Sequence, residues 1–165
     1  MGHMRMSSGS TGFRERRWSH APSRWSGPDV IRTILERFNT LAVVGLSSKP
    51  TRASFGVAAY MKARGYRIIP VNPHEESVLG EKAYATLDDV PGLIEIAVIF
   101  RRPECVPDVV EAAIRRGAKV IWMQEGVIHE EAARRARDAG LEVVQDRCIL
   151  KEYAKRFLSR ESCDL

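Results

Sequence analysis

The chain has 165 residues, a formal net charge of +5, 28% charged residues and 44% hydrophobic residues. This length suits one domain with a core and is too short for two large domains, and the composition is typical of a soluble globular protein. No apolar run approaches the roughly 20 residues that a membrane-spanning helix needs, so we expect no membrane partner.

Most of the net positive charge comes from the first 28 residues. Five arginines stand there against one acid, Glu15, which gives this segment a net charge of +4 and leaves +1 for the rest of the chain. Residues 1–4 have the pattern of an expression-vector scar. We therefore predict a flexible N-terminal tail over residues 1–27 with a vector-derived start, followed by a single domain over residues 28–160.

The first predicted elements of the domain form a helix–strand–helix–strand series. Apolar residues at helical spacing predict a helix over residues 29–38. Residues 40–44 are continuously apolar, which is typical of a parallel strand covered on both faces. A helix over residues 53–64 should end at Gly65, and a second strand should cover residues 66–71.

The remaining segments continue this alternation. Pro73 ends the second strand, because it pushes the preceding residue toward an extended conformation. A polar turn over residues 74–80, a short edge strand over 82–84 and a helical turn capped by Thr86 should follow. The later predicted elements are strands over 94–100, 119–123 and 141–144 and helices over 103–116, 130–139 and 150–158. This order predicts an α/β fold of the Rossmann-like, doubly wound type, with a mainly parallel five- to six-stranded sheet and helices on both faces.

Polar segments follow four of the predicted strands. They cover residues 45–52, 71–73, 100–102 and 124–126. Ligands of open α/β sheets bind beyond the carboxyl ends of the strands, where the strand order reverses. The four segments together therefore indicate one binding site at that edge of the sheet.

The first of these segments has the chemistry of a phosphate-binding loop. Gly45 permits a tight turn, and Ser47, Ser48 and the amides at the start of the next helix are hydrogen-bond donors. Lys49 and Arg52 supply positive charge. A solvated turn between strand and helix is the alternative interpretation.

The same loop lacks the dinucleotide fingerprint GxGxxG. Ser47 stands at the second glycine position and Pro50 at the third. The second strand ends in Asn72 and Pro73 instead of the acid that binds ribose hydroxyls, so we expect no carboxylate at its tip. The Walker sequence GxxxxGK[ST] is absent as well. These departures argue against a nicotinamide cofactor and against ATP hydrolysis.

The cysteines and histidines indicate no metal site. Cys105, Cys148 and Cys163 are widely spaced, with no CxxC pair and no Cys/His cluster. An odd number of cysteines without a secretory signal favours a reducing cytoplasm. Cys148 follows an arginine, so a reactive thiol and a buried packing residue are both open.

Several segments together resemble a known family. They are residues 42–47, 69–73, 79–80, 98–101 and 122–126. The sequence looks like the small stand-alone CoA-binding proteins, which are similar to the amino-terminal domain of the succinyl-CoA synthetase α subunit. The resemblance covers about residues 29–157.

The resemblance implies that the ligand is coenzyme A or an acyl-CoA thioester, bound without catalysis. It implies that the first loop meets the phosphates, the end of the second strand lines the adenosine side, and residues 124–126 approach the pantetheine or the adenine edge. Phe100 and Arg101 would form the wall of the cleft. The implied site residues are Gly45, Ser47, Ser48, Lys49, Arg52, Val71, Asn72, Pro73, Phe100, Arg101, Met123, Gln124, Glu125 and Gly126.

The sequence departs from the family at one point. A basic residue often follows the Asn-Pro pair and helps to hold the 3′-phosphate of CoA, whereas His74 and Glu75 stand here. Lys49 or Arg52 then has to supply that charge.

The synthetase also uses a phosphorylated histidine in a second domain and an ATP-grasp partner, and neither is expected from this polypeptide. We therefore expect a binding protein with no catalytic residues and no metal. Three alternatives stay open: an NAD(P)-linked oxidoreductase, an accessory subunit of an acyl-CoA ligase, and a regulatory module that senses acyl-CoA. The expected partner is the small-molecule CoA ligand, with no nucleic acid despite Trp18 and Trp25 in the basic tail. A homodimer or a ligase-like partner chain is open.

Overall fold

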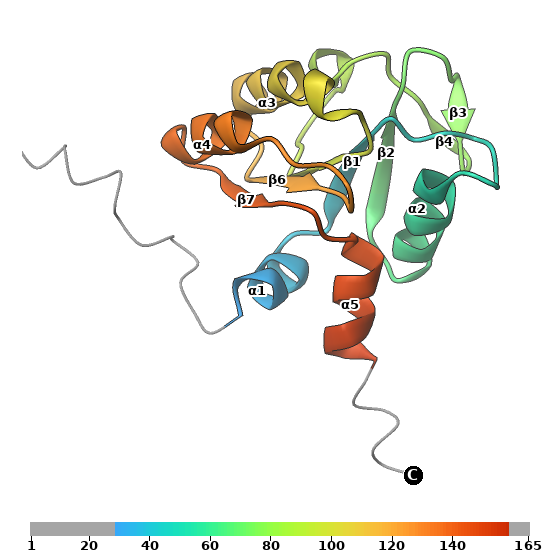
Figure 1. The fold of residues 1–165 in the computed structure, drawn as a ribbon. Coiled ribbons are helices and arrows are strands. Elements are labelled where there is room, and N and C mark those ends of the chain that lie inside the picture. The colour runs from blue at the N-terminus through green and yellow to red at the C-terminus, as the bar shows by residue number, and fades with distance from the viewer. Residues whose placement is uncertain (1–28, 159–165) are drawn as a thin grey trace, which may run out of the picture.

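The structure is a computed structural model that describes residues 29–158. The predictions for the N-terminal tail and for Cys163 lie outside these residues. One sheet dominates the described part, with five parallel strands in the order β2-β1-β5-β6-β7 (Figure 1). The strands are β1 (Thr40–Val44), β2 (Arg67–Val71), β5 (Ile96–Ile99), β6 (Val120–Met123) and β7 (Glu142–Val144). The α-helices are α1 (Val30–Arg37), α2 (Ala53–Ala63), α3 (Val106–Arg115), α4 (Glu130–Asp138) and α5 (Ile149–Phe157).

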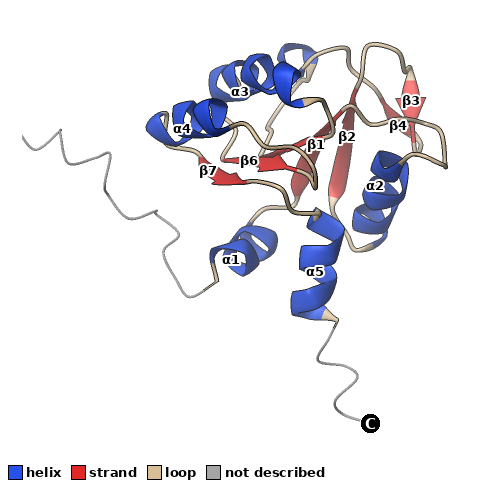
Figure 2. Ribbon diagram, in the orientation of Figure 1, coloured by secondary structure: helices blue, strands red, loops and turns tan. Residues whose placement is uncertain are grey.

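The helices cover both faces of this sheet, as predicted (Figure 2). The chain starts at a central strand, moves to the edge strand β2, and then crosses β1 to build the other half in order. The strand order therefore reverses between β1 and β5. These features confirm the Rossmann-like, doubly wound fold, with all five strands of the main sheet parallel.

Alternate side chains of the strands pack into two separate cores. In β1, Leu41 and Val43 pack with α1, α2 and α5, while Ala42 and Val44 pack with α3 and α4. All five residues of β1 are buried. Burial on both faces explains why the sequence of this strand is continuously apolar and shows no alternation with polar residues.

The segment after β2 differs from the prediction. It forms a small antiparallel hairpin of β3 (Ser77–Val78) and β4 (Glu81–Lys82), where a polar turn was expected. Leu79 and Gly80 both have positive φ, 56° and 78°, which suits the tight turn of a two-residue hairpin. Of the predicted edge strand over residues 82–84, Lys82 belongs to β4 and Tyr84 forms an isolated bridge with Val71.

The predicted helix over 103–116 also differs at its start. Pro103–Cys105 form a 3₁₀ turn, and α3 begins after it. Pro107 has no N–H to donate and is tolerated because it lies in the first turn of α3. Another 3₁₀ turn, Leu87–Asp89, occurs where a helical turn was predicted, and the Asp89 carboxylate accepts hydrogen bonds from the backbone N–H and the Oγ1 of Thr86.

Candidate functional site

Gly45 ends β1 at the point where the strand order reverses. Its φ is +90°, and a Cβ at this position would lie 2.4 Å from the carbonyl oxygen of Phe100. The Gly45 N–H donates to the Val71 carbonyl (2.8 Å), and the Phe100 N–H donates to the Val44 carbonyl (2.8 Å). The ends of β1, β2 and β5 are therefore held together at a position that only glycine fits.

The loop between β1 and α2 is fixed by its serines. The Ser47 N–H donates to Ser54 Oγ of α2 (3.1 Å), and Ser47 Oγ accepts from the Lys49 N–H (3.1 Å). Arg52 occupies the N-cap position of α2, where no side chain caps the helix and the first turn holds no acid. The positive end of the α2 dipole is thus not neutralised by the residues of its own first turn.

Basic side chains gather in the sequence around these strand ends. Lys49 and Arg52 lie in the first loop and are exposed, and Arg101 and Arg102 follow β5. None of the four forms an ion pair with another residue among 29–158. Their charges are therefore available to an anionic ligand.

Asn72, at the end of β2, holds the next turn against the first loop. Its Nδ2 donates to the Leu46 carbonyl (3.0 Å), and its Oδ1 accepts from the His74 N–H (2.9 Å). Its own N–H donates to the Tyr84 carbonyl (2.8 Å). Both ends of this amide are used within the protein, so Asn72 is a positioning residue for the turn at residues 72–75.

The turn carries a carboxylate to the first loop. Glu75 Oε1 accepts hydrogen bonds from the Ser48 N–H and from Ser48 Oγ, both at 3.0 Å. These two bonds, followed by the positive charges of Lys49 and His74, hold the pKa of Glu75 below its usual value. The end of β2 itself carries Asn72 and Pro73 and no carboxylate, as expected, but Glu75 brings a carboxylate to the first loop, which was not predicted.

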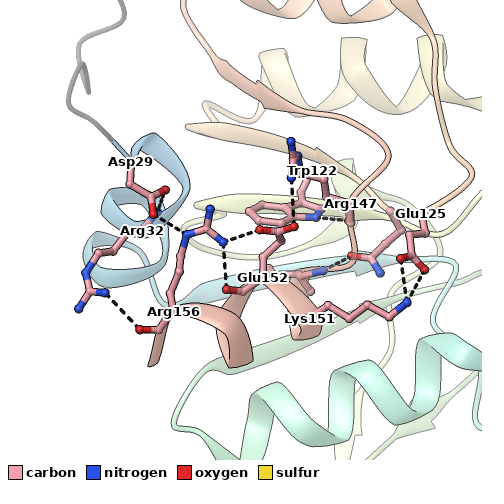
Figure 3. Close-up of polar contacts among 10 residues, drawn as sticks. Asp29, Arg32, Trp122, Glu125, Arg147, Lys151, Glu152 and Arg156 are labelled. Atoms are coloured by element: carbon pink, nitrogen blue, oxygen red, sulfur yellow. Dashed lines mark hydrogen bonds and ion pairs between the residues drawn. The ribbon is translucent and has the colours of Figure 1, made fainter. Parts of the chain in front are cut away.

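The segment after β6 holds the start of α5. Gln124 is buried, and its Oε1 accepts from the Ile149 N–H (2.9 Å). The indole Nε1 of Trp122 donates to the Arg147 carbonyl (2.8 Å), as Figure 3 shows. Cys148, next to these contacts, is buried, which favours its interpretation as a packing residue.

The next two residues make further contacts with the same region. The Glu125 carboxylate accepts from Lys151 Nζ of α5 (2.8 Å), and the Gly126 N–H donates to Asp146 Oδ1 (2.7 Å). Asp146 has a φ of 56°, so a strained residue supplies this acceptor. The polar groups of residues 124–126 are thus directed to the β7–α5 connection.

The structure brings most, but not all, of the predicted site residues together. Contacts join Gly45, Ser48, Asn72 and Phe100 to their neighbours at the ends of β1, β2 and β5. The segments that follow the same three strands also hold Ser47, Lys49, Arg52, Pro73 and Arg101. Val71 and Met123 are buried. Residues 124–126 follow β6, two strands away from β1, and Gln124 among them is buried. The roles of Glu75 and Asp146 were missed, and the only sequence signal for Glu75 was an acid where the family often has a base.

A pocket of about 250 Å³, which we call the aromatic pocket, lies at the other end of the strands, where β1 and β2 begin. Tyr66 in its wall donates its hydroxyl to the Leu35 carbonyl (2.6 Å), and burial raises the pKa of this tyrosine to about 12. Tyr153 in the wall packs edge-on against Tyr66. The lining is Leu35, Glu36, Asn39, Arg64, Gly65, Tyr66, Tyr153 and Phe157.

No helix of the described part is long and apolar enough to cross a membrane. No group of three or more His, Cys, Asp or Glu side chains within 29–158 is arranged to hold a metal ion.

Comparisons with known proteins agree with the resemblance inferred from the sequence. Residues 39–154 match the family model described as CoA binding domain. The Bacillus subtilis protein YneT, whose name calls it uncharacterized, is 42% identical over 124 residues, which are 75% of this chain and 92% of YneT. A solved structure of a hypothetical protein from Pyrococcus horikoshii OT3 is 39% identical with a TM-score of 0.76, and covers 82% of this chain and 95% of its own.

A more distant relative is part of a larger enzyme. The α subunit of an ADP-forming acetate–CoA ligase II from Pyrococcus furiosus is 27% identical over 120 residues, 66% of this chain. The match spans only 26% of that subunit. With the family model matching well over half of its residues, the chain belongs to the CoA-binding domain family.

Proposed function

We propose that this protein binds coenzyme A or an acyl-CoA thioester at the carboxyl ends of β1, β2 and β5, and that it catalyses no reaction by itself. The observation that carries the proposal is the set of unpaired cations at these strand ends, next to the uncapped start of α2. Phosphates are the anions that such a loop and helix end suit best. The family match supports coenzyme A as the nucleotide that carries these phosphates.

In this arrangement Lys49 and Arg52 contact the phosphates, together with the backbone amides of the loop. Asn72 and Pro73 line the adenosine side, and Phe100 and Arg101 form the wall over β5. Residues 124–126 mark the far end, toward the pantetheine. Two or three charge-assisted hydrogen bonds of roughly 1.5–3 kcal/mol each contribute about 3–9 kcal/mol, and micromolar affinity corresponds to about 8 kcal/mol after ordering costs, so contacts with the adenosine and the pantetheine have to add to them. We place the protein in the cytoplasm, with the CoA ligand as its partner.

Isothermal titration with CoA and with adenosine tests this proposal. The charge reversal Arg52→Glu should weaken CoA binding at least about tenfold, because it replaces a phosphate contact by repulsion, which costs about 1.4 kcal/mol or more. Adenosine has no phosphate, so its affinity should not change. Arg134→Glu is the control, since Arg134 is exposed on α4 and forms no ion pair with the described residues. The proposal fails if wild-type protein shows no CoA binding at millimolar ligand.

A second candidate is an accessory role in an acyl-CoA ligase, which the similarity to the ligase α subunit favours. The histidines of the described part offer no support for phosphoryl transfer. His129 Nδ1 accepts from the Ala132 N–H as the cap of α4, and His74 lies in the turn after β2. An assay of acyl-CoA formation from CoA, ATP and acetate, with and without an ATP-grasp chain from the same genome, separates the two candidates. A fluorescence titration with NADH checks the oxidoreductase alternative.

A further inference from the structure

Ser48, in the loop proposed to bind phosphate, donates two hydrogen bonds to a carboxylate of the protein. Ser48 is exposed in the first loop, and both of its donors, the backbone N–H and Oγ, point to the same oxygen of Glu75. An anionic oxygen that accepts two hydrogen bonds from a loop serine has the same hydrogen-bonding chemistry whether it belongs to a carboxylate or to a phosphate. The protein therefore holds its own anion in the loop proposed to bind phosphate.

Glu75 reaches this place through a built turn. Asn72 connects its side chain to the Leu46 carbonyl on one side and to the His74 N–H on the other. The Glu75 N–H donates to the Asn72 carbonyl (3.2 Å) and closes the turn. The contact thus depends on two segments 27 residues apart in the chain, and it is more than a local bond of a flexible side chain.

The charges around Glu75 determine how the carboxylate would interact with an entering phosphate. Lys49 and His74 are the groups of positive sign that act on the carboxylate. A phosphate entering the loop would meet the negative charge of Glu75 and would have to share Lys49 with it. If Glu75 stays, the phosphate loses both Ser48 donors, and if Glu75 moves away, its two hydrogen bonds are broken.

We propose that Glu75 sets the affinity and the selectivity of the site by occupying the Ser48 donors in competition with the phosphates of the ligand. This inference rests on the proposed function, and it concerns phosphate-bearing ligands only. Adenosine has no group that competes for Ser48, so Glu75 should not affect its binding. The residue that departs from the family pattern is thereby an internal competitor of the ligand.

Titration of CoA and adenosine into Glu75→Gln tests the inference. The amide keeps the shape and can still accept from Ser48, but it lacks the charge, and neutral hydrogen bonds are about half as strong as charge-assisted ones. We expect CoA to bind about 5- to 10-fold more tightly than to wild type, with adenosine unchanged. Glu76→Gln is the matched control, because it makes the same charge change one residue away at an exposed side chain. The Ser48 amide resonance should shift in Glu75→Gln before ligand is added, which checks that the contact exists in solution.

The outcomes separate this inference from the proposed function. If wild type binds CoA and Glu75→Gln binds it equally or more weakly, the inference is overturned and the proposed function stands. Equal tightening in Glu75→Gln and Glu76→Gln also overturns it, since the effect would then be one of net charge. If neither wild type nor Glu75→Gln binds CoA, both fail, because removal of the competitor then exposes no phosphate site.

Discussion

Charged residues have different partners in two regions of the molecule, the contact between α1 and α5 and the carboxyl ends of β1, β2 and β5. At the α1–α5 side, Arg156 Nε contacts Asp29 (2.7 Å), its Nη1 contacts Glu152, and Glu152 also pairs with Arg147 (3.2 Å), as Figure 3 shows. At the carboxyl ends of the strands, Lys49 and the three arginines at 52, 101 and 102 form no ion pair within the described part, although the charge of Lys49 helps to lower the pKa of Glu75.

The difference indicates that the charges of one region stabilise the fold and that those of the other are available to a ligand. A partly buried arginine between two acids, with a side chain 13% exposed, joins α1 to α5 and serves the fold. Exposed cations without partners add little to stability and leave their charge for a ligand. The sequence composition alone does not distinguish structural from ligand-binding arginines, since arginines occur in both regions.

The largest effect should come from Gly45→Ala. The alanine would have to adopt a left-handed conformation, and its Cβ would overlap the Phe100 carbonyl at 2.4 Å. We expect a loss of about 3 kcal/mol in the free energy of unfolding, measured by urea denaturation, together with loss of CoA binding.

Gly56→Ala is the matched control for this change. Gly56 lies inside α2, and nothing lies within 4 Å of a Cβ built there. It should stabilise the protein by about 0.5–1 kcal/mol. Equal effects of the two substitutions would contradict the close approach of β1 and β5 on which the site depends.

Arg156→Ala should have the next largest effect on stability and none on CoA binding. It leaves Glu152, whose side chain is 11% exposed, with only one of its two arginine partners. We expect a loss of about 2–3 kcal/mol, less than for a fully buried pair. The exposed pair of Arg115 and Asp88 offers a control, and Arg115→Ala should cost much less stability than Arg156→Ala.

The pH dependence of the same variant sharpens this test. The hydrogen bond from Arg156 lowers the pKa of Asp29. Burial acts to raise the pKa of Glu152, but hydrogen bonds from Arg156 and Arg147 outweigh it and lower the value. Acids with depressed pKa values stabilise the fold above their ordinary values, 3.8 and 4.5, and this stability is lost as the pH falls through the lowered values. Stability should therefore fall less steeply below about pH 5 in Arg156→Ala than in wild type. Parallel curves would exclude this account of the network.

Much of the fold follows from the sequence because its signals are local. The apolar run at residues 40–44 and the helical spacing at 29–38 depend on burial along one element. The hairpin of β3 and β4 was not predicted, because its strands have two residues each and its turn places Leu79 at positive φ. No propensity rule favours leucine there.

The site is less readable because its contacts are not local. Ser48 and Glu75 both follow strands in the sequence, but only the pairing of β1 with β2 and the side chain of Asn72 bring them together. Gln124 was predicted at the ligand because it follows a strand, and that stays a prediction. Its structural role was not predicted, because the sequence does not show that its side chain is buried and accepts from the first N–H of α5, at Ile149.

The central claim is that the ligand binds at the carboxyl ends of the strands and not in the aromatic pocket where β1 and β2 begin. Mapping of backbone amide shifts in ¹⁵N-labelled protein during a CoA titration tests it most directly. We predict that the amide resonances of Gly45, Ser48 and Arg52 shift with a common saturation curve, while those of Gly65, Tyr66 and Tyr153 do not change. Shifts at Gly65, Tyr66 and Tyr153 with a silent first loop would contradict the claim.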